Sequence, residues 1–362
     1  MIYIFYGEMI YTCFIFRHNC PLRDNVCFAL TRRLSVKRLR NCTFFLAVLL
    51  LTISSGKAEP AILKYSAGCE FSALQKEDGS AKTLVRPDLT LYYKVFGQGK
   101  PVLVLNGGPG FSGELVEPIA RVIARRGCAI VPDQRGTGHS IPEDETAITL
   151  DNSIADFEAL RDELGYAQWT VLGTSWGGMI AMDYASKHPE SLKGLVLVDS
   201  GGTSAASFSR AFIDNITARM TSDDRAAGKF WAQPEIIARD PYRAAIESMR
   251  CMIPAEYFDR SKAWRFIAGM KVGKQHYNPA ASKFLSPEYE KQAASRIEAL
   301  GKIDIPTLIM HGRQDPMPES VALGLHELLR GSRLVFIDRC GHMPWIEQPE
   351  EFKKTLFEFL FD

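Results

Sequence analysis

The chain has 362 residues, of which 46% are hydrophobic and 23% are charged. This composition is ordinary for a globular protein, and the length suffices for one large α/β domain with an insertion or for two smaller domains. The chain holds 43 Lys and Arg against 42 Asp and Glu, and residues 1–58 contain eight of these bases and two of the acids. The remainder carries a net charge of about −5, which gives no electrostatic reason to expect nucleic acid or an anionic membrane as a partner.

Residues 1–58 are expected to form a leader. A basic cluster at 32–40 precedes an apolar run at 44–53, and small residues follow at 54–58. This order is typical of a secretory signal peptide, and the apolar run is too short to cross a bilayer comfortably. We therefore expect export to the periplasm or the medium, with no stable membrane partner after cleavage. An uncleaved membrane anchor is the alternative.

Residues 1–31 fit no part of a signal peptide, because they lie ahead of the basic cluster where such a signal should begin. We expect an over-extended start, with the true one near Leu34 or Val36. Four cysteines follow the leader, and none of them forms a C-x-x-C pair, so a zinc or thioredoxin-type site is not expected. One disulfide of unknown pairing is compatible with export. These cysteines are Cys69, Cys128, Cys251 and Cys340.

Strands and helices alternate along most of the remaining chain. Strands are expected at 84–96, 101–105, 128–131, 168–172 and 195–198, and helices at 113–126, 151–164 and 176–187. The alternation resumes later with strands at 305–310 and 334–337 and helices at 318–330 and 349–361. Short, wholly apolar strands are typical of a parallel sheet that is buried on both faces. The pattern predicts an α/β fold with a mostly parallel sheet and right-handed crossovers.

The alternation stops near residue 202. Residues 203–301 show no buried-strand pattern and are helical in character, rich in Ala, Arg and Met. We therefore predict one sheet domain formed by 59–202 and 302–362, interrupted by a helical cap at 203–301.

A G-x-S-x-G motif follows the strand at 168–172, and its central residue is Ser175. This motif, between a strand and a helix, presents the serine hydroxyl at the end of the sheet on a sharp turn. Gly173 and Gly177 are required because a Cβ at either position would collide with the neighbouring strand or helix. Ser175 is the predicted nucleophile.

A serine hydroxyl needs a base to take its proton, and the base needs a partner that fixes its tautomer. Chemistry on parallel sheets collects at the carboxyl ends of strands. Asp315 and His342 each follow a strand end after the insertion. The order Ser175, Asp315, His342 is the one expected for an α/β-hydrolase triad.

Other acids and histidines compete for these roles. Asp199 follows the strand at 195–198 and is the rival acid, although we expect it to bind backbone amides at the start of the insertion. His311 is a rival base that could equally be a buried, hydrogen-bonded histidine. His139 and His188 lie in a loop and at a helix end, and are expected to be solvated.

Acyl transfer also needs donors that face the developing oxyanion. We expect one to be the backbone N–H of Trp176, directly after the nucleophile. The other should come from the glycine-rich loop after the strand at 101–105, and we favour Gly108. The remaining loop residues are Asn106, Gly107, Pro109 and Gly110.

Three segments of the sequence resemble the prolyl iminopeptidase family of α/β-hydrolases: N-G-G-P-G at 106–110, D-Q-R-G-T-G-H-S at 133–140 and G-T-S-W-G-G at 173–178. The resemblance covers roughly 84–202 and 303–361. It implies hydrolysis of an N-terminal residue, usually proline, from a peptide or arylamide, without a metal or other cofactor. The family usually opens its glycine loop with histidine where this chain has Asn106, whose side chain could make the same turn-stabilising hydrogen bond.

In that family the cap supplies acidic residues that bind the free amine of the substrate. No motif in the cap of this chain singles them out, and the sequence does not indicate the oligomeric state. The candidates are Asp214, Asp223, Asp224, Glu235, Asp240, Glu247, Glu256 and Asp259.

Two alternatives to the aminopeptidase stay open. One is an esterase or lactonase with an apolar acyl substrate, which would use the same residues. The other is a ligand-binding, receptor-like homologue with little turnover. Epoxide hydrolysis and dehalogenation are disfavoured, because members of the fold with those activities use an aspartate where this chain has Ser175.

Overall fold

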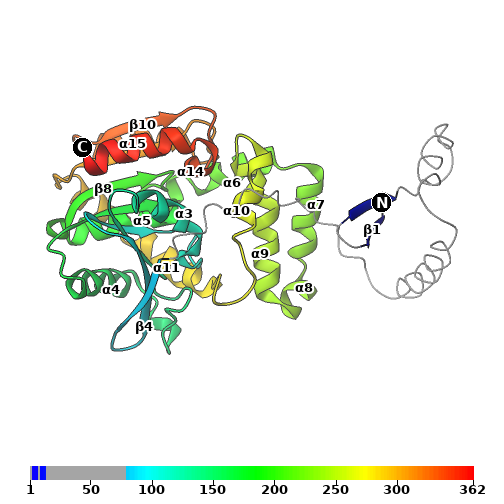
Figure 1. Ribbon diagram of the computed structural model, residues 1–362, viewed down its shortest axis with the longest axis horizontal. Helices are drawn as coiled ribbons and strands as arrows, with labels where there is room; N and C mark the ends of the chain where they lie inside the picture. Colours follow the sequence, from blue (N-terminus) through cyan, green and yellow to red (C-terminus); the bar gives the residue numbers. More distant parts are fainter. Residues whose placement is uncertain (1, 7–8, 14–78) are drawn as a thin grey trace. The chain divides into compact units, whose positions relative to one another are not determined.

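The computed structural model describes residues 2–6, 9–13 and 79–362, and the chain forms two compact units, Met1–Ala61 and Ile62–Asp362 (Figure 1). In the first unit, β1 (Ile2–Tyr6) and β2 (Met9–Cys13) pair as an antiparallel hairpin. The basic cluster, apolar run and small residues of the predicted leader, and Cys69, lie outside the described residues. No helix within the described part of the chain is long and apolar enough to cross a bilayer.

The second unit is built on an eight-stranded sheet with the order β10-β9-β8-β7-β5-β6-β4-β3. The six strands from β5 to β10 pair in parallel, and β4 and β3 continue the sheet as antiparallel strands. A mostly parallel sheet is therefore confirmed. The strands are β3 (Ser80–Val85), β4 (Thr90–Gly97), β5 (Pro101–Leu105), β6 (Cys128–Pro132), β7 (Trp169–Thr174), β8 (Leu192–Val198), β9 (Thr307–Gly312) and β10 (Arg333–Ile337).

Two predicted elements need correction. The single strand expected at 84–96 is the end of β3 and most of β4, separated by a turn that the 2.8 Å hydrogen bond from Arg86 N to Leu89 O closes. Pro87 lies in this turn, where its fixed φ and missing N–H disfavour a continuous strand. The helix expected at 113–126 begins as a 3-10 turn, and its α-helical part, α3, covers only Glu117–Ile123.

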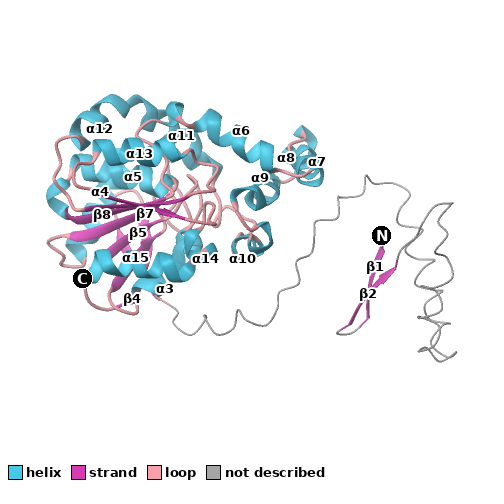
Figure 2. Ribbon diagram, turned by 90° about the horizontal axis from the view of Figure 1, so that it is seen from above, coloured by secondary structure: helices cyan, strands magenta, loops and turns pink. Residues whose placement is uncertain are grey.

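Helices cover both faces of the sheet (Figure 2). Along β5, Leu103 and Leu105 enter one apolar cluster while Val102 and Val104 enter the other, because successive side chains of a strand point to opposite faces. The first cluster includes side chains of α4, α5 and α13, and the second includes side chains of α3, α14 and α15. The bounds are α4 (Leu150–Glu163), α5 (Trp176–Lys187), α13 (Glu319–Leu328), α14 (Pro344–Glu347) and α15 (Pro349–Phe361).

The helices between β8 and β9 fall into two groups. Helices α6 to α10 extend away from the sheet, whereas α11 and α12 lie beside α4 and α5 (Figures 1 and 2). The helical character of 203–301 is visible in the sequence, but the surface against which each helix packs is not. The bounds are α6 (Ser209–Arg219), α7 (Ser222–Trp231), α8 (Pro234–Arg239), α9 (Pro241–Met252), α10 (Trp264–Ile267), α11 (Pro279–Lys291) and α12 (Ala293–Leu300).

Candidate active site

Ser175 occupies a sharp turn between β7 and α5. Its φ of 52° and ψ of −118° are unusual for a residue with a side chain, and its backbone N–H donates to Val198 O at 3.0 Å. A Cβ on Gly173 would lie 2.2 Å from Gly177 O, and one on Gly177 would lie 2.2 Å from Leu105 O. The steric need for both glycines is therefore confirmed. The turn leaves Ser175 partly exposed among buried neighbours.

The glycine loop lies directly against this turn. A Cβ on Gly107 would come within 2.9 Å of the Ser175 Cβ, so only glycine lets the loop approach the serine so closely. The side chain of Asn106 is 1% exposed, and its Nδ2 donates to Phe111 O at 2.9 Å across the loop. Asparagine therefore makes a turn-stabilising hydrogen bond at the position where the family usually has histidine. Gly108, at φ 57°, follows in the same loop.

Residues of the segment 133–140 form hydrogen bonds with the glycine loop and the residues that follow it. Gln134 Nε2 donates to the backbone oxygen and to Oδ1 of Asn106, both at 3.0 Å. Asp133 accepts hydrogen bonds from Gly113 N and His139 N, each at 2.8 Å. Gln134 is thus a supporting residue that sequence reasoning did not single out, although the D-Q-R-G run was the signal for it.

Asp315 and His342 are in direct contact. Asp315 lies between β9 and α13, His342 lies between β10 and α14, and the carboxylate oxygens are 2.8 and 3.0 Å from His342 Nδ1. Both residues are buried, with 6% and 5% of their surface exposed. Burial raises the pKa of Asp315 to about 7, and the neighbouring Asp199 carboxyl and the hydrogen bond from Met317 N oppose this rise. Through Nδ1 the carboxyl fixes the ring of His342 and leaves Nε2 for another partner.

The competing residues have other partners. His311 is inside β9, where Nε2 donates to Met317 O at 3.1 Å, and burial lowers the pKa of its imidazole to about 4. His139 has a side chain that is 59% exposed, and that of His188 is 38% exposed, as expected for solvated histidines. Asp199 does bind a backbone amide, but this is Gly312 N at the end of β9 and not an amide of the insertion. The correction follows from strand order, since β9 lies beside β8 in the sheet.

One cluster of possible metal ligands occurs in the part of the chain that the structure describes. Asp199, Asp315 and His342 each offer one ligand atom, and these atoms lie within 4.8 Å of one another. In this cluster, His342 Nδ1 already forms a hydrogen bond with the Asp315 carboxylate. The described cysteines Cys128, Cys251 and Cys340 are free thiols.

A cap segment lies against the histidine loop. His342 N donates to Glu256 O at 2.9 Å, and a Cβ on Gly341 would meet the same carbonyl oxygen at 2.0 Å. The Glu256 residue is 9% exposed, and burial raises the pKa of its carboxyl to about 7 although His342 acts in the opposite direction. Phe212 on α6 also faces the site, with its ring centroid 5.9 Å from that of His342.

The other seven candidate acids of the cap have no such relation to His342. Five bind partners within the cap, either as helix caps or in pairs with arginines; these are Asp214, Asp224, Asp240, Glu247 and Asp259. Asp223 and Glu235 are exposed in the first turns of α7 and α8. Among the eight candidates, the structure therefore singles out Glu256.

Comparison with known proteins defines the class. The profile of the family described as alpha/beta hydrolase fold matches residues 100–349. The chain belongs to this family, which confirms the predicted fold class.

Similar proteins narrow the comparison. A proline iminopeptidase of Lactobacillus crispatus (strain ST1) is 28% identical over 284 residues, which cover 74% of this chain and 94% of the relative. The crystal structure of proline iminopeptidase from Mycobacterium smegmatis matches with a TM-score of 0.55 and 21% identity, over 78% of this chain and 97% of that one. Est816, described as an N-acyl homoserine lactone degrading enzyme, matches with a TM-score of 0.58 and 22% identity. The match covers 77% of this chain and 100% of that one. The resemblance to proline iminopeptidases is confirmed, while the structural likenesses show the fold alone.

Proposed function

We propose that the protein is a serine hydrolase in which Ser175, His342 and Asp315 form the catalytic triad. His342 takes the proton of the Ser175 hydroxyl through Nε2 as the oxygen attacks the substrate carbonyl carbon. Asp315 holds the Nδ1 side of the ring and stabilises the imidazolium. His342 then gives the proton to the leaving group, and a water that it deprotonates releases the acyl group from Ser175.

The oxyanion of each tetrahedral intermediate is assigned to two backbone N–H groups, those of Trp176 and Gly108. Trp176 begins α5, where the first N–H groups of a helix have no carbonyl partner within the helix. The loop that carries Gly108 lies close to the nucleophile, because Gly107 packs against Ser175. The hydrogen bond from Gln134 to Asn106 holds this loop in place. A preorganised donor pair of this kind typically supplies several kcal/mol of transition-state stabilisation.

We assign the substrate class as peptides or arylamides with a free N-terminal amine, as in the proline iminopeptidases to which the chain is similar. The observation that carries this assignment is the Glu256 carboxyl. It is buried beside His342, and no cation of the described residues is paired with it. A buried carboxyl without a partner is unfavourable when ionised, so an ammonium group placed beside it restores the ionised form.

A fluorophosphonate probe tests the nucleophile. The wild type should be labelled at one serine, and Ser175→Ala should abolish the labelling while it keeps the melting temperature. An unlabelled, folded wild type would remove the enzyme assignment and favour the receptor-like alternative.

Paired substrates test the amine site. Proline arylamide should be cleaved, and its N-acetylated form should be cleaved poorly. Glu256→Gln should lower kcat/KM for the arylamide by about 10- to 100-fold, the value of a charge-assisted hydrogen bond, and leave a short-chain aryl ester almost unaffected. Asp214→Asn is the matched control, because Asp214 is an exposed cap acid whose partner is Arg210. Rapid ester cleavage without arylamide cleavage would establish the esterase or lactonase alternative.

Export is proposed separately, on the order of basic, apolar and small residues in the leader. Sequencing the N-terminus of protein recovered from the periplasm or medium tests it. A mature chain that begins near residue 59 is the expected result. Recovery only from the membrane fraction, with the apolar run intact, would establish the anchored alternative.

A further inference from the structure

Asp199 is a buried acid that the triad does not use. It follows β8 with a φ of 44°, in the left-handed region that aspartate enters more readily than most residues with a side chain. The residue is 1% exposed, and Oδ1 accepts a hydrogen bond from Gly312 N at 2.8 Å. Its Oδ2 is fully buried and receives no hydrogen bond from any donor of the described residues. An ionised oxygen in this position would be strongly destabilised.

No Lys or Arg of the described residues forms an ion pair with Asp199, which leaves the neighbouring imidazoles to consider. The nearest imidazole outside the triad is His311, whose Nδ1 is 3.7 Å from Asp199 Oδ1. Because Nε2 of His311 must be the donor to the carbonyl oxygen of Met317, the neutral ring carries no proton on Nδ1. Burial lowers the pKa of this imidazole to about 4, so it stays neutral near pH 7.

Other elements bring a second carboxyl, the triad imidazole and a thiol close to Asp199. Asp315 and His342 come from the loops after β9 and β10, and the ligand atoms of all three residues lie within 4.8 Å of one another. Cys340 precedes His342 in the same loop, its thiol donates to Gly341 O at 3.3 Å, and burial raises the pKa of this thiol. Two ionised carboxylates this close together in a buried site repel each other strongly.

The partners of Asp315 differ from those of Asp199. Asp315 accepts hydrogen bonds from Met317 N at 2.8 Å and from His342 Nδ1, and the positive charge of Arg219 on α6 also favours its ionised form. If the two carboxyls share one proton, these partners favour the ionised form of Asp315 and the protonated form of Asp199.

We propose that Asp199 is a positioning residue for the triad, which holds a proton on Oδ2 and donates it as a hydrogen bond to Asp315. This inference rests on the proposed function, in which Asp315 is the acid of the triad. Burial, and then the charge of Asp315, raise the pKa of Asp199 well above its ordinary range, while the hydrogen bond from Asp199 lowers that of Asp315. The pair thus presents one negative charge to His342. A second negative charge beside His342 would stabilise the imidazolium and so oppose its return to the free base.

Asp199→Asn distinguishes a protonated from an ionised Asp199. The asparagine amide can donate to Asp315 through Nδ2 and accept from Gly312 N through Oδ1, so it reproduces the contacts of the protonated acid. We expect kcat/KM for an aryl ester to stay within about threefold of the wild type, with the acid limb of its pH profile unmoved. Asp199→Ala removes the donor and should lower kcat by about 10-fold or more.

The opposite result is equally specific. If Asp199 were ionised, Asp199→Asn would remove a full charge a few ångströms from His342, and the acid limb would move down by about one to two pH units. A shift of one unit or more overturns the proposal. The proposal is also overturned if a chelator inactivates the enzyme and a divalent cation restores the activity. A bound cation, and not a proton, would then neutralise the two acids.

Infrared spectroscopy separates the failure of this inference from the failure of the proposed function. The wild type should show a carboxylic-acid C=O stretching band at neutral pH that is lost in Asp199→Asn, whether or not the protein turns over any substrate. A wild type that labels with fluorophosphonate and lacks this band would refute the shared proton alone. A wild type that shows the band and does not label would refute only the serine hydrolase.

Discussion

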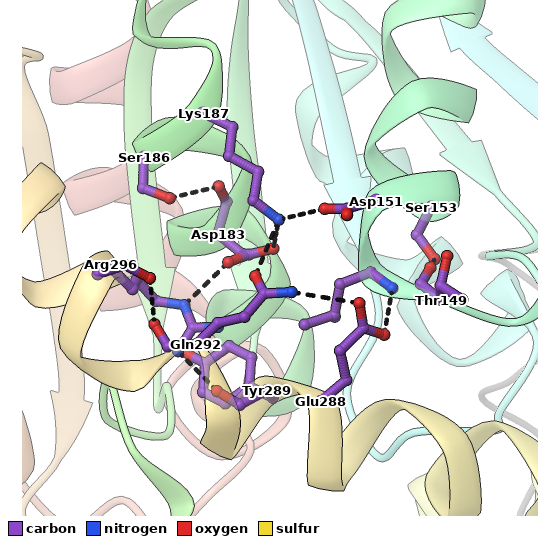
Figure 3. A network of polar contacts seen from close by, with 12 residues as sticks. Thr149, Asp151, Ser153, Asp183, Ser186, Lys187, Glu288, Tyr289, Gln292 and Arg296 are labelled. Carbon is purple, nitrogen blue, oxygen red and sulfur yellow. Dashed lines mark hydrogen bonds and ion pairs between the residues drawn. The ribbon is translucent and has the colours of Figure 1, made fainter.

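Asp183 and Asp199 are both 1% exposed, yet the structure treats their charges in opposite ways. Asp183 on α5 has two cations: Arg296 Nε lies 3.0 Å from Oδ1, and Lys187 Nζ lies 2.9 Å from Oδ2 (Figure 3). Asp199 has no Lys or Arg partner among the described residues, and the carboxyl of Asp315 is its neighbour. Opposite charges in contact favour each other's ionised form inside a folded protein, whereas two adjacent buried carboxyls are stable only if one holds a proton.

The difference separates a region that joins elements of the fold from the candidate active site. Arg296 joins α12 to α5, and its guanidinium lies 3.5 Å from the ring centroid of Tyr289 while Nη1 donates to the carbonyl oxygens of Tyr289 and Thr203. At the carboxyl ends of the strands, the buried carboxyls of Asp199 and Asp315 instead lie next to each other, which is electrostatically unfavourable. Active sites commonly sacrifice stability in this way.

The largest expected effect comes from breaking the acid pair at Asp315. Asp315→Asn should lower kcat by about 10⁴-fold, because an amide facing Nδ1 favours the wrong tautomer of His342. The free energy of unfolding should change little or rise, since one buried carboxyl is removed from the pair. Arylamide and ester kinetics measure the first quantity and urea denaturation the second. Asp338→Asn, an exposed acid with a side chain that is 77% exposed, is the control and should keep kcat within about twofold. Near-normal activity of Asp315→Asn would instead assign the triad acid to Asp199.

Removing a cation from Asp183 tests the other side of the comparison. Arg296→Met should lower the free energy of unfolding by about 3 kcal/mol or more, because it leaves a buried carboxylate short of a partner and two carbonyl oxygens without a donor. At temperatures where the variant is folded, kcat should stay close to that of the wild type. Arg210→Met removes an exposed partner of Asp214, and its effect should stay within about 0.5 kcal/mol. Equal losses for the two variants in urea denaturation would contradict a structural role for the buried pair.

The pH dependence of stability sharpens the comparison through Glu256, another buried acid that has no Lys or Arg partner among the described residues. Its carboxyl has a pKa of about 7 in the folded protein against an ordinary value of 4.5, so the folded state binds the proton more tightly. The resulting stabilisation is complete below about pH 4.5 and is lost as the pH rises through about 7, by roughly 3 kcal/mol at most. Urea denaturation of the wild type and Glu256→Gln at about pH 5 and pH 8 measures it. The wild type should lose more stability between these pH values than the variant. Parallel losses would show that Glu256 is ionised in both states.

Much of the site could be read from local sequence because the relevant constraints are local. The serine turn needs glycines at fixed positions, and the strands and helices on either side carry their own apolar patterns, so the helices at 176–187 and 349–361 appear at their predicted bounds. The order of Asp315 and His342 along the chain follows from the same alternation. Their mutual contact is a consequence of neighbouring parallel strands.

The remaining features depend on contacts between residues far apart in the chain. The sequence offered eight cap acids without a means of choosing, and only the packing of the segment at Glu256 on the loop of His342 distinguishes one of them. The same holds for α11 and α12, whose helical pattern is local but whose attachment to α4 and α5 is not.

The sequence by itself determined the α/β-hydrolase fold, the serine turn and the candidate residues at the strand ends, because backbone sterics and hydrophobic periodicity act over a few residues. Only the tertiary structure decided which buried acid meets a cation and which meets another acid. Electrostatic energies inside a protein depend on distance and burial, and strand order sets both: it brings Asp199 beside Asp315 although 115 positions separate them.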